Sequence, residues 1–325
     1  MNSIRRILVA VKDPSARSLP AAVKALQLAR AFGAELELFH ALDSTLYVNM
    51  LEMAEGRLRR SEDDERSQFV QRLERIAARA RLHGIRVSVM VEWDYPAYEA
   101  IVRRSSRTGA DLIVADRHAG RHIAAGWLGL ADWELLRLSP VPVLLVKGRR
   151  PYRHPTVLAA VDPGQAFSKP AALDPEILRL AGAFSSALRG KLHAIHAYAP
   201  VIATLAVTSA GELTRVAESE RARVSRRFDQ LLQVQATHIP LAQRYLVGGD
   251  PSEVIRTTAG RLGTDLVVIG AISRSGLKRL VIGNTAERLL DRLPCDLLVV
   301  KPVGFVNRVP RARRGPHRLA AQPSC

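Results

Sequence analysis

An internal repeat is the feature of this 325-residue sequence that most limits its fold. The stretch Asp111–Val114 recurs as Asp265–Val268, 154 residues further on, and Val143–Lys147 recurs as Leu297–Lys301 with the same offset. A repeat that spans a whole strand–loop–helix–strand unit indicates a duplicated domain rather than a solenoid. We therefore expect two domains that share one fold.

Each half alternates short apolar runs with amphipathic stretches. The runs 7–11 and 157–161 open the two halves and are typical of strands buried on both faces. Asp162-Pro163 after the second run echoes Asp13-Pro14 after the first. Long helices are predicted over 47–82 and 211–235. The fold class that follows is α/β, with two tandem doubly wound domains, each on a five-stranded parallel sheet.

The expected domain boundaries follow from composition. Residues 1–148 form the first domain, 149–154 a polar linker and 155–303 the second domain. From 304 to 325 the chain is rich in Arg, Pro and Gly and has no apolar period, which predicts a basic disordered tail. The two cysteines, Cys295 and Cys325, provide no disulfide framework, and no apolar run approaches the ~18 residues of a membrane span. We expect a cytoplasmic protein.

A glycine-bearing loop in the second half is the strongest functional signal. Gly270, Gly276 and Gly283 lie between a predicted strand and a helix that begins near Asn284. Backbone N–H groups and the helix dipole at such a turn favour an anion, and glycine lets a phosphate approach the backbone. In a doubly wound sheet, ligands bind where the strand order reverses, which places this loop opposite Asp162. The first half has Asp116 in place of Gly270, and a carboxylate repels a phosphate.

These residues resemble the universal stress protein family. Its nucleotide-binding members carry Gly-x2-Gly-x9-Gly-Ser/Thr after the fourth strand, and the matching positions here are Gly270, Ser273, Gly283 and Asn284, followed by Thr285. The segments 283–287 and 132–137, together with Trp93 and 98–101, resemble the tandem-domain branch of the family. The resemblance covers nearly the whole chain as two domains, and it is weaker in the long helices.

The resemblance implies a set of ligand contacts. Asp162 matches the family's acid near adenine, and Ala197 matches a backbone contact to the base. The phosphate contacts it implies are Gly270, Ser273, Gly283 and Asn284, and Gly276 and Thr285 complete the candidate set. Ser273 stands where the family has its second glycine, and Asn284 stands where it has a hydroxyl side chain. The cofactor implied is ATP with Mg²⁺.

The function that follows is that of a non-enzymatic stress-response factor that binds adenine nucleotide, or another small anionic ligand, in its second domain. The sequence lacks the nucleophile and P-loop motifs of hydrolases and transferases, so no catalytic residue and no metal ligand is predicted. The final strands of the two domains are apolar edges that need covering. The family resemblance implies that they pair in an intramolecular pseudo-dimer, and a homodimer is the alternative.

Two other functions stay open at this point. One is an ATP-using enzyme, a weak ATPase or phosphotransferase, in which the loop cations Arg274, Lys278 and Arg279 would stabilise charge at the γ-phosphate. The other is a nucleic-acid binder acting through the tail, because the chain carries a net charge of +17 and the tail contributes several arginines without an acid.

Overall fold

The structure is a computed structural model, and it divides the chain into two compact units. Unit 1 comprises Met1–Pro151 with Val306–Cys325, and unit 2 comprises Tyr152–Phe305. The structure describes residues 4–43, 45–48, 57–117, 130–163, 173–199, 210–234, 238–271, 289, 292–302, 304–315 and 317–320. Residues 306–325 therefore belong with unit 1, although they follow unit 2 in the sequence.

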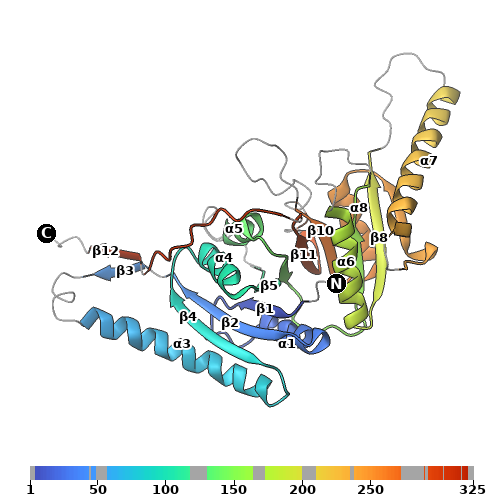
Figure 1. The fold of residues 1–325 in the computed structure, drawn as a ribbon. Coiled ribbons are helices and arrows are strands. Elements are labelled where there is room, and N and C mark those ends of the chain that lie inside the picture. Colours follow the sequence, from blue (N-terminus) through green and yellow to red (C-terminus); the bar gives the residue numbers. More distant parts are fainter. Residues whose placement is uncertain are drawn as a thin grey trace. The chain divides into compact units, whose positions relative to one another are not determined.

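Unit 1 is built on five parallel strands in the part of the chain that is described (Figure 1). They are β1 (Arg6–Ala10), β2 (Glu35–Leu42), β4 (Val87–Trp93), β5 (Leu112–Asp116) and β6 (Val143–Val146). Their order is β4-β2-β1-β5-β6, with β1 in the centre. The residues of β1 from 7 to 9 are fully buried, which is why the sequence shows an unbroken apolar run there rather than alternation.

Helices cover both faces of this sheet. They are α1 (Pro20–Phe32), α3 (Arg57–Arg81), α4 (Ala97–Thr108) and α5 (Leu130–Leu138). Figure 1 shows α4 and α5 on one side and α1 and α3 on the other. Gly33 ends α1 and Gly109 ends α4, with φ of +67° and +64°. Glycine adopts this left-handed conformation without steric cost, so both helices stop where the sequence places a glycine.

Unit 2 repeats this architecture. Its strands are β7 (Thr156–Ala160), β8 (Lys191–Tyr198), β9 (Arg244–Gly248), β10 (Leu266–Gly270) and β11 (Asp296–Val300). They are parallel and lie in the order β11-β10-β7-β8-β9, which is the order of unit 1 with β7 in the place of β1. The predicted fold class is confirmed: two doubly wound α/β domains, each on five parallel strands.

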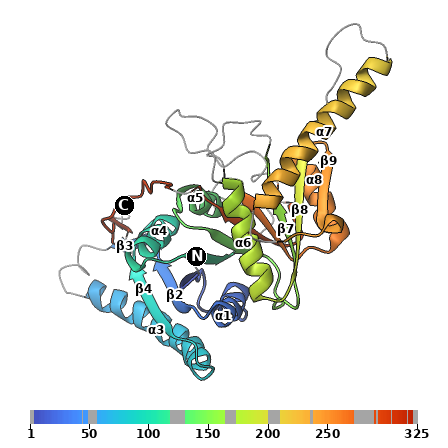
Figure 2. The same cartoon turned by 45° about the vertical axis from the view of Figure 1, so that its right-hand side comes forward.

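The described helices of unit 2 are α6 (Leu173–Ala187), α7 (Ala210–Val234) and α8 (Pro251–Leu262), with a short 3-10 turn, η1 (Leu241–Gln243), before β9. Helix α6 packs on β7 and β10 (Figure 2). The carboxylate of Asp250 accepts the N–H groups of Ser252 and Glu253, and Pro251 is the first helical residue, so both residues favour the start of α8. Most of the helix predicted after residue 284 lies outside the described residues.

A carboxylate contact recurs in both units at matching positions. Asp111 precedes β5, and its Oδ2 accepts the N–H of Arg6, at the start of β1, over 2.9 Å. Asp265 precedes β10, and its Oδ2 accepts the N–H of Thr156, at the start of β7, also over 2.9 Å. The duplication therefore extends to single hydrogen bonds that join the first strand of each unit to its neighbour.

The long helix of unit 1 begins later than predicted. Sequence periodicity placed its start near residue 47, whereas α3 begins at Arg57 and Thr45–Val48 forms a short strand, β3. This strand pairs in parallel with β12 (His317–Ala320), near the end of the chain. The residues of β3 favour strands, but their partner lies so far away in sequence that local periodicity carries no trace of the pairing.

The described residues of the tail, 304–315 and 317–320, also differ from the expectation of disorder. Figure 1 shows this segment, at the red end of the colour scale, running past α5 and α4 to β12. Asn307 donates from Nδ2 to Ser106 Oγ over 3.1 Å, and the N–H of Arg314 donates to Asp94 Oδ1 over 3.0 Å. Low hydrophobicity predicted disorder because it leaves little to bury. This tail is held mainly by polar contacts with buried acids instead.

Candidate functional site

The candidate site lies at the carboxyl edge of the sheet of unit 2. Strands β10, β7 and β8 are neighbours there, and the chain order reverses between β7 and β10. Asp162 follows β7, Ala197 lies near the end of β8, and Gly270 is the last residue of β10. Three of the predicted residues therefore come from three adjacent strand ends on both sides of the switch point, the place where doubly wound sheets bind ligands.

Asp162 is held by its backbone while its carboxylate stays accessible. Its N–H donates to Oδ1 of Asp174, in the first turn of α6, over 3.1 Å. Its side chain is 27% exposed, and Oδ1 lies 3.9 Å from Nδ1 of His196. The carboxylate is thus positioned at the sheet edge with room to accept hydrogen bonds from a ligand.

Two buried histidines mark matching positions beside the first strands. Nδ1 of His196 lies 3.0 Å from the carbonyl oxygen of Val161, and Nδ1 of His40 lies 2.7 Å from that of Val11. Burial lowers the pKa of His40, which favours the neutral ring. Since Val161 matches Val11, Asp162 corresponds to Lys12. The echo of Asp13-Pro14 in the sequence is therefore one residue out of register, and unit 1 has a cation where unit 2 has the candidate acid.

Ala197 lies beyond the point where the pairing of β8 with β7 ends, so its backbone groups can contact a ligand there. The pairing of β7 with β8 ends at Ala160 and Ile195, whereas the pairing of β8 with β9 continues to Tyr198. Among the pairs that the structure describes, Ala197 has a partner on β9 and none on β7. Its backbone on the β7 side therefore faces the same edge as Asp162.

Gly270 is a glycine for a packing reason. A Cβ added there would lie 2.6 Å from Cδ2 of Leu173 and 3.1 Å from Cδ1 of Ile177, both fully buried in the first turns of α6. Real Cβ atoms essentially never approach another atom as closely as 2.6 Å, so a side chain at 270 would force the side chain of Leu173 to shift. The close approach that the sequence assigned to a phosphate is made, at this residue, by an aliphatic side chain.

The other predicted loop contacts lie outside the described residues. These contacts are Ser273, Gly276, Gly283, Asn284 and Thr285. The loop cations Arg274, Lys278 and Arg279 also lie outside the described residues. Lys301, which follows β11, is described and only 7% exposed. Burial lowers its pKa to about 8, and its Nζ lies 4.5 Å from the ring centroid of Phe305. It is a buried amine at the same edge of the sheet that the sequence analysis did not single out.

The corresponding strand end of unit 1 is closed by a carboxylate. Asp116 ends β5, and its Oδ1 accepts the N–H of Ala21, in the first turn of α1, over 2.8 Å. Leu19, at the N-cap position, makes no side-chain cap. Asp116 therefore supplies from the sheet the acceptor that the helix start needs, and its negative charge complements the helix dipole. An anion site at this helix end is already filled by the chain itself.

Sequence reasoning missed the residues that shape the edge from α6 and those that hold the tail. Leu173 and Asp174 lie in the first turn of α6, but nothing in their sequence pattern indicates that they contact Gly270 and Asp162. Within the described ranges, no three His, Cys, Asp or Glu side chains are grouped as metal ligands. No helix among the described residues is long and apolar enough to cross a membrane.

Comparison with known proteins identifies the family. The sequence model of the universal stress protein family matches residues 3–147 and 155–301, one match for each unit. The chain therefore belongs to the universal stress protein family and carries two of its domains in tandem.

The most informative relatives have the same tandem organisation. Universal stress protein E of Escherichia coli K12 is 25% identical over 299 residues, which cover 91% of this chain and 93% of that protein. The crystal structure of a protein of unknown function from Pseudomonas aeruginosa PAO1 matches with a TM-score of 0.72 at 26% identity, covering 92% of this chain and 93% of that one. A universal stress protein from Archaeoglobus fulgidus shares the fold, with a TM-score of 0.58 at 17% identity.

Proposed function

We propose that this protein is a cytoplasmic, non-enzymatic stress-response factor that binds an adenine nucleotide, or another small anionic ligand, in unit 2. The observation that carries the proposal is the placement of Asp162, Ala197 and Gly270 at three adjacent strand ends beside the switch point. Doubly wound sheets take their ligands at this place. Membership of the family accounts for the fold, and these three residues are the basis of the proposed ligand site.

The described residues fit the adenine end of a nucleotide. The carboxylate of Asp162 is accessible and can accept from an exocyclic amine, while the backbone of Ala197 lies past the β7 ladder and can pair with the base edge. Because Leu173 packs against Gly270, the phosphate contacts of the proposal rest with Ser273, Gly276, Gly283, Asn284 and Thr285. ATP would bring Mg²⁺ as its counterion.

Unit 1 is proposed to lack this activity. Lys12 stands in the place of Asp162, and Asp116 places its carboxylate at the start of α1, where a phosphate would be repelled. Unit 1 then serves assembly. We extend the proposal to an intramolecular pseudo-dimer in which the apolar final strands of the two units cover each other, with a homodimer as the alternative.

Titration calorimetry with Mg-ATP on the full chain tests the nucleotide proposal. We expect one site per chain, and Asp162→Ala should weaken binding by about tenfold or more, since a hydrogen bond to a charged group contributes on the order of 1.5–3 kcal/mol. Asp13→Ala is the matched control, because it removes an acid near the corresponding edge of unit 1 and should leave binding unchanged. Equal losses in both variants, or no heat with the native chain, would overturn the proposal.

Two further measurements separate the alternatives. Native mass spectrometry of freshly purified protein reports whether a nucleotide or a different small anion accompanies the chain. Phosphate release from Mg-ATP distinguishes binding from catalysis: we expect none above the blank, because no described residue is positioned as a general base beside the edge. Steady multiple turnover that is lost with Arg274→Ala or Lys278→Ala would favour the enzyme instead.

A further inference from the structure

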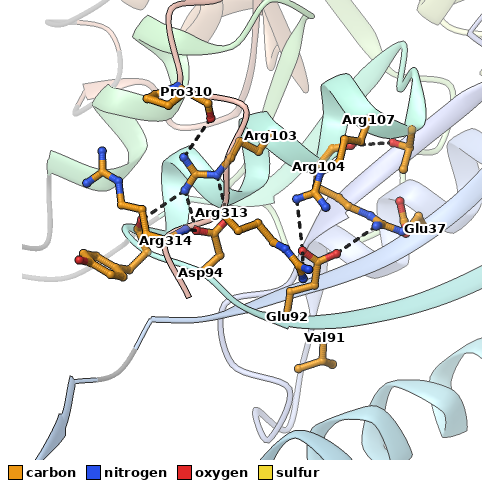
Figure 3. A network of polar contacts seen from close by, with 12 residues as sticks. Glu37, Val91, Glu92, Asp94, Arg103, Arg104, Arg107, Pro310, Arg313 and Arg314 are labelled. Carbon is orange, nitrogen blue, oxygen red and sulfur yellow. Dashed lines mark hydrogen bonds and ion pairs between the residues drawn. The ribbon is translucent and has the colours of Figure 1, made fainter. Parts of the chain in front are cut away.

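The chain's C-terminal segment makes its principal polar contacts with the end of β4 and with α4 (Figure 3). Val309 is buried, and its N–H donates to Asn307 Oδ1 over 2.8 Å in a tight turn. Arg103 donates from Nη1 to the carbonyl oxygen of Pro310 over 3.4 Å. Next, Arg313 and Arg314 reach a group of acids in unit 1, and Figure 3 shows these arginines beside Glu92 and Asp94.

We name Glu92, Asp94 and Glu99 the acidic cluster. Arg313 Nη1 lies 3.4 Å from Glu92 Oε2, and Arg314 Nη2 lies 2.9 Å from Glu99 Oε2. The N–H of Arg314 donates to Asp94 Oδ1, and its guanidinium carbon lies 5.8 Å from the ring centroid of Tyr95. Each acid of the cluster therefore receives its own group from the arginine pair: a guanidinium, a backbone N–H and a second guanidinium that also stacks on an aromatic ring.

The cluster is shaped without help from the tail. Both oxygens of Asp94 accept from Arg103, over 2.7 and 2.8 Å, while Glu92 accepts from Arg104 and Arg107. Arg104 also pairs with the buried Glu37. In the described part of this network, four carboxylates of the sheet and α4 face three arginines of α4. One negative charge is left over until the tail arrives.

Burial is divided unequally between the two sides of the contact. The acidic side chains are 6%, 1% and 13% exposed for Glu92, Asp94 and Glu99. The arginine side chains stay 54% and 42% exposed for Arg313 and Arg314. A charge that is buried needs a partner, whereas a half-solvated guanidinium leaves at little cost because water replaces its bonds. The arrangement is that of a preformed receptor and a loosely held ligand.

We propose that the acidic cluster of unit 1 is a recognition site for a peptide that carries two adjacent arginines, that Arg313–Arg314 is its resident ligand, and that an arginine-pair segment of a partner protein exchanges for it. The site reads one backbone N–H and two guanidinium groups at fixed spacing. The chain as a whole carries +17, so it repels basic peptides in general, whereas this local excess of acid attracts one.

The test uses a fluorescent peptide of the sequence 306–320 and measures anisotropy against three full-length proteins. The native chain has its cluster filled. Arg313→Ala/Arg314→Ala, the vacated variant, removes both guanidinium groups from the cluster and leaves only the backbone N–H of residue 314. Arg308→Ala/Arg311→Ala removes the same charge from two exposed arginines of the tail. We expect the peptide to bind the vacated variant about tenfold or more tighter than the other two, since it no longer competes with a tethered ligand.

Peptide variants define the specificity. A peptide with alanine at the positions of Arg313 and Arg314 should lose binding to the vacated protein. A peptide with alanine at the positions of Arg308 and Arg311 should keep most of its affinity. Adding Glu99→Gln to the vacated protein should weaken the intact peptide. Raising the salt concentration should weaken binding of the peptide further, because salt screens the attraction between exposed charges and the Debye length is only ~10 Å at 0.1 M.

Amide hydrogen exchange of the tail in the full-length protein provides an independent test. Amides of 306–315 should exchange faster in Arg313→Ala/Arg314→Ala than in Arg308→Ala/Arg311→Ala, and adding excess peptide to the native chain should raise their exchange. The proposal would be overturned if the peptide bound all three proteins with equal affinity. It would also be overturned if neither the loss of Arg313 and Arg314 nor added peptide changed the hydrogen exchange of the tail, because the tail would then be a fixed structural segment.

Discussion

The two units carry chemically different residues at the end of equivalent strands, β5 in unit 1 and β10 in unit 2. In unit 1 the strand carries Asp116 and the helix beside it carries the small Ala21, so the carboxylate reaches the helix N–H groups. In unit 2 the strand carries Gly270 and the helix carries Leu173 and Ile177, which fill the space of the missing side chain. The strand end contacts the neighbouring helix in both units, through a hydrogen bond in unit 1 and through aliphatic packing in unit 2. A glycine at a predicted phosphate loop can therefore reflect helix packing as well as ligand binding.

The helices α4 and α8 show a second difference of this kind. Both have twelve residues and end at a left-handed glycine, so Arg103 of α4 matches Thr257 of α8. Arg103 is buried against Asp94 and Glu99, whereas Thr257 is exposed. Unit 1 thus uses buried charge on the helix face where unit 2 leaves its residue in water, and only unit 1 has a tail to cover that charge.

The largest effect is expected from Arg103→Met. The change leaves Asp94 and Glu99 buried with fewer donors, which should cost about 3–5 kcal/mol of unfolding free energy. Thr257→Met, the matched change in unit 2, should stay within about 0.5 kcal/mol. All three tryptophans belong to unit 1, at positions 93, 127 and 133, so urea unfolding followed by tryptophan fluorescence isolates this unit. Equal effects of the two substitutions would contradict the comparison.

Lys301→Met is expected to stabilise unit 2. Burial lowers the pKa of Lys301 from 10.5 to about 8, and a depressed lysine pKa opposes folding where the unfolded chain holds the proton. Stability of the native chain should therefore rise with pH between about 8 and 10.5, and the variant should gain about 3 kcal/mol at pH 7 and lose that slope. The check is urea unfolding followed by circular dichroism across this range.

Its control is Lys147→Met, because Lys147 is the matching but exposed residue of unit 1. We expect little change in stability and an unaltered pH slope there. A native chain whose stability falls between pH 8 and 10.5, while the Lys301 variant behaves identically, would be the result against this prediction.

Gly270→Ala sharpens the comparison at the strand end. The added Cβ meets Leu173 and Ile177, so the substitution should cost about 1–3 kcal/mol through overpacking. In a chain that already carries Leu173→Ala, the same substitution should cost much less, because the nearer of the two obstructing side chains is gone. The double-mutant cycle, measured by denaturant unfolding, then gives a coupling of similar size. An additive cycle would indicate that the glycine is there for another reason.

Asp116→Ala is expected to have the smallest effect. It removes the acceptor at the start of α1, and the loss of a helix cap typically costs about 1 kcal/mol. Tryptophan fluorescence in urea should show this loss in unit 1, and Asp116→Asn, which keeps an acceptor oxygen, should recover part of it. A variant as stable as the native chain would mean that Asp116 does not cap the helix.

Sequence reasoning succeeded wherever a feature depends on local pattern. Apolar runs at 7–11 and 157–161 located the first strand of each unit, and the repeat located the strands around 111–114, 143–147, 265–268 and 297–301. It also predicted that Asp162 lies opposite the Gly270 loop, since parallel strand ends meet at one sheet edge. Ala197 was implied by the family resemblance. Sequence reasoning failed for β3 and for the tail, whose partners lie far away in sequence.

The sequence by itself determined the duplication, the doubly wound parallel fold class and the asymmetry between Asp116 and Gly270, because period, turn chemistry and residue size act over a few neighbouring residues. Only the tertiary structure decided what those residues meet. Arg314 finds Asp94 across 220 residues of chain, and Leu173 comes to lie against Gly270. Such contacts depend on how separate elements pack, and packing and charge pairing act through space without leaving a local pattern in the sequence.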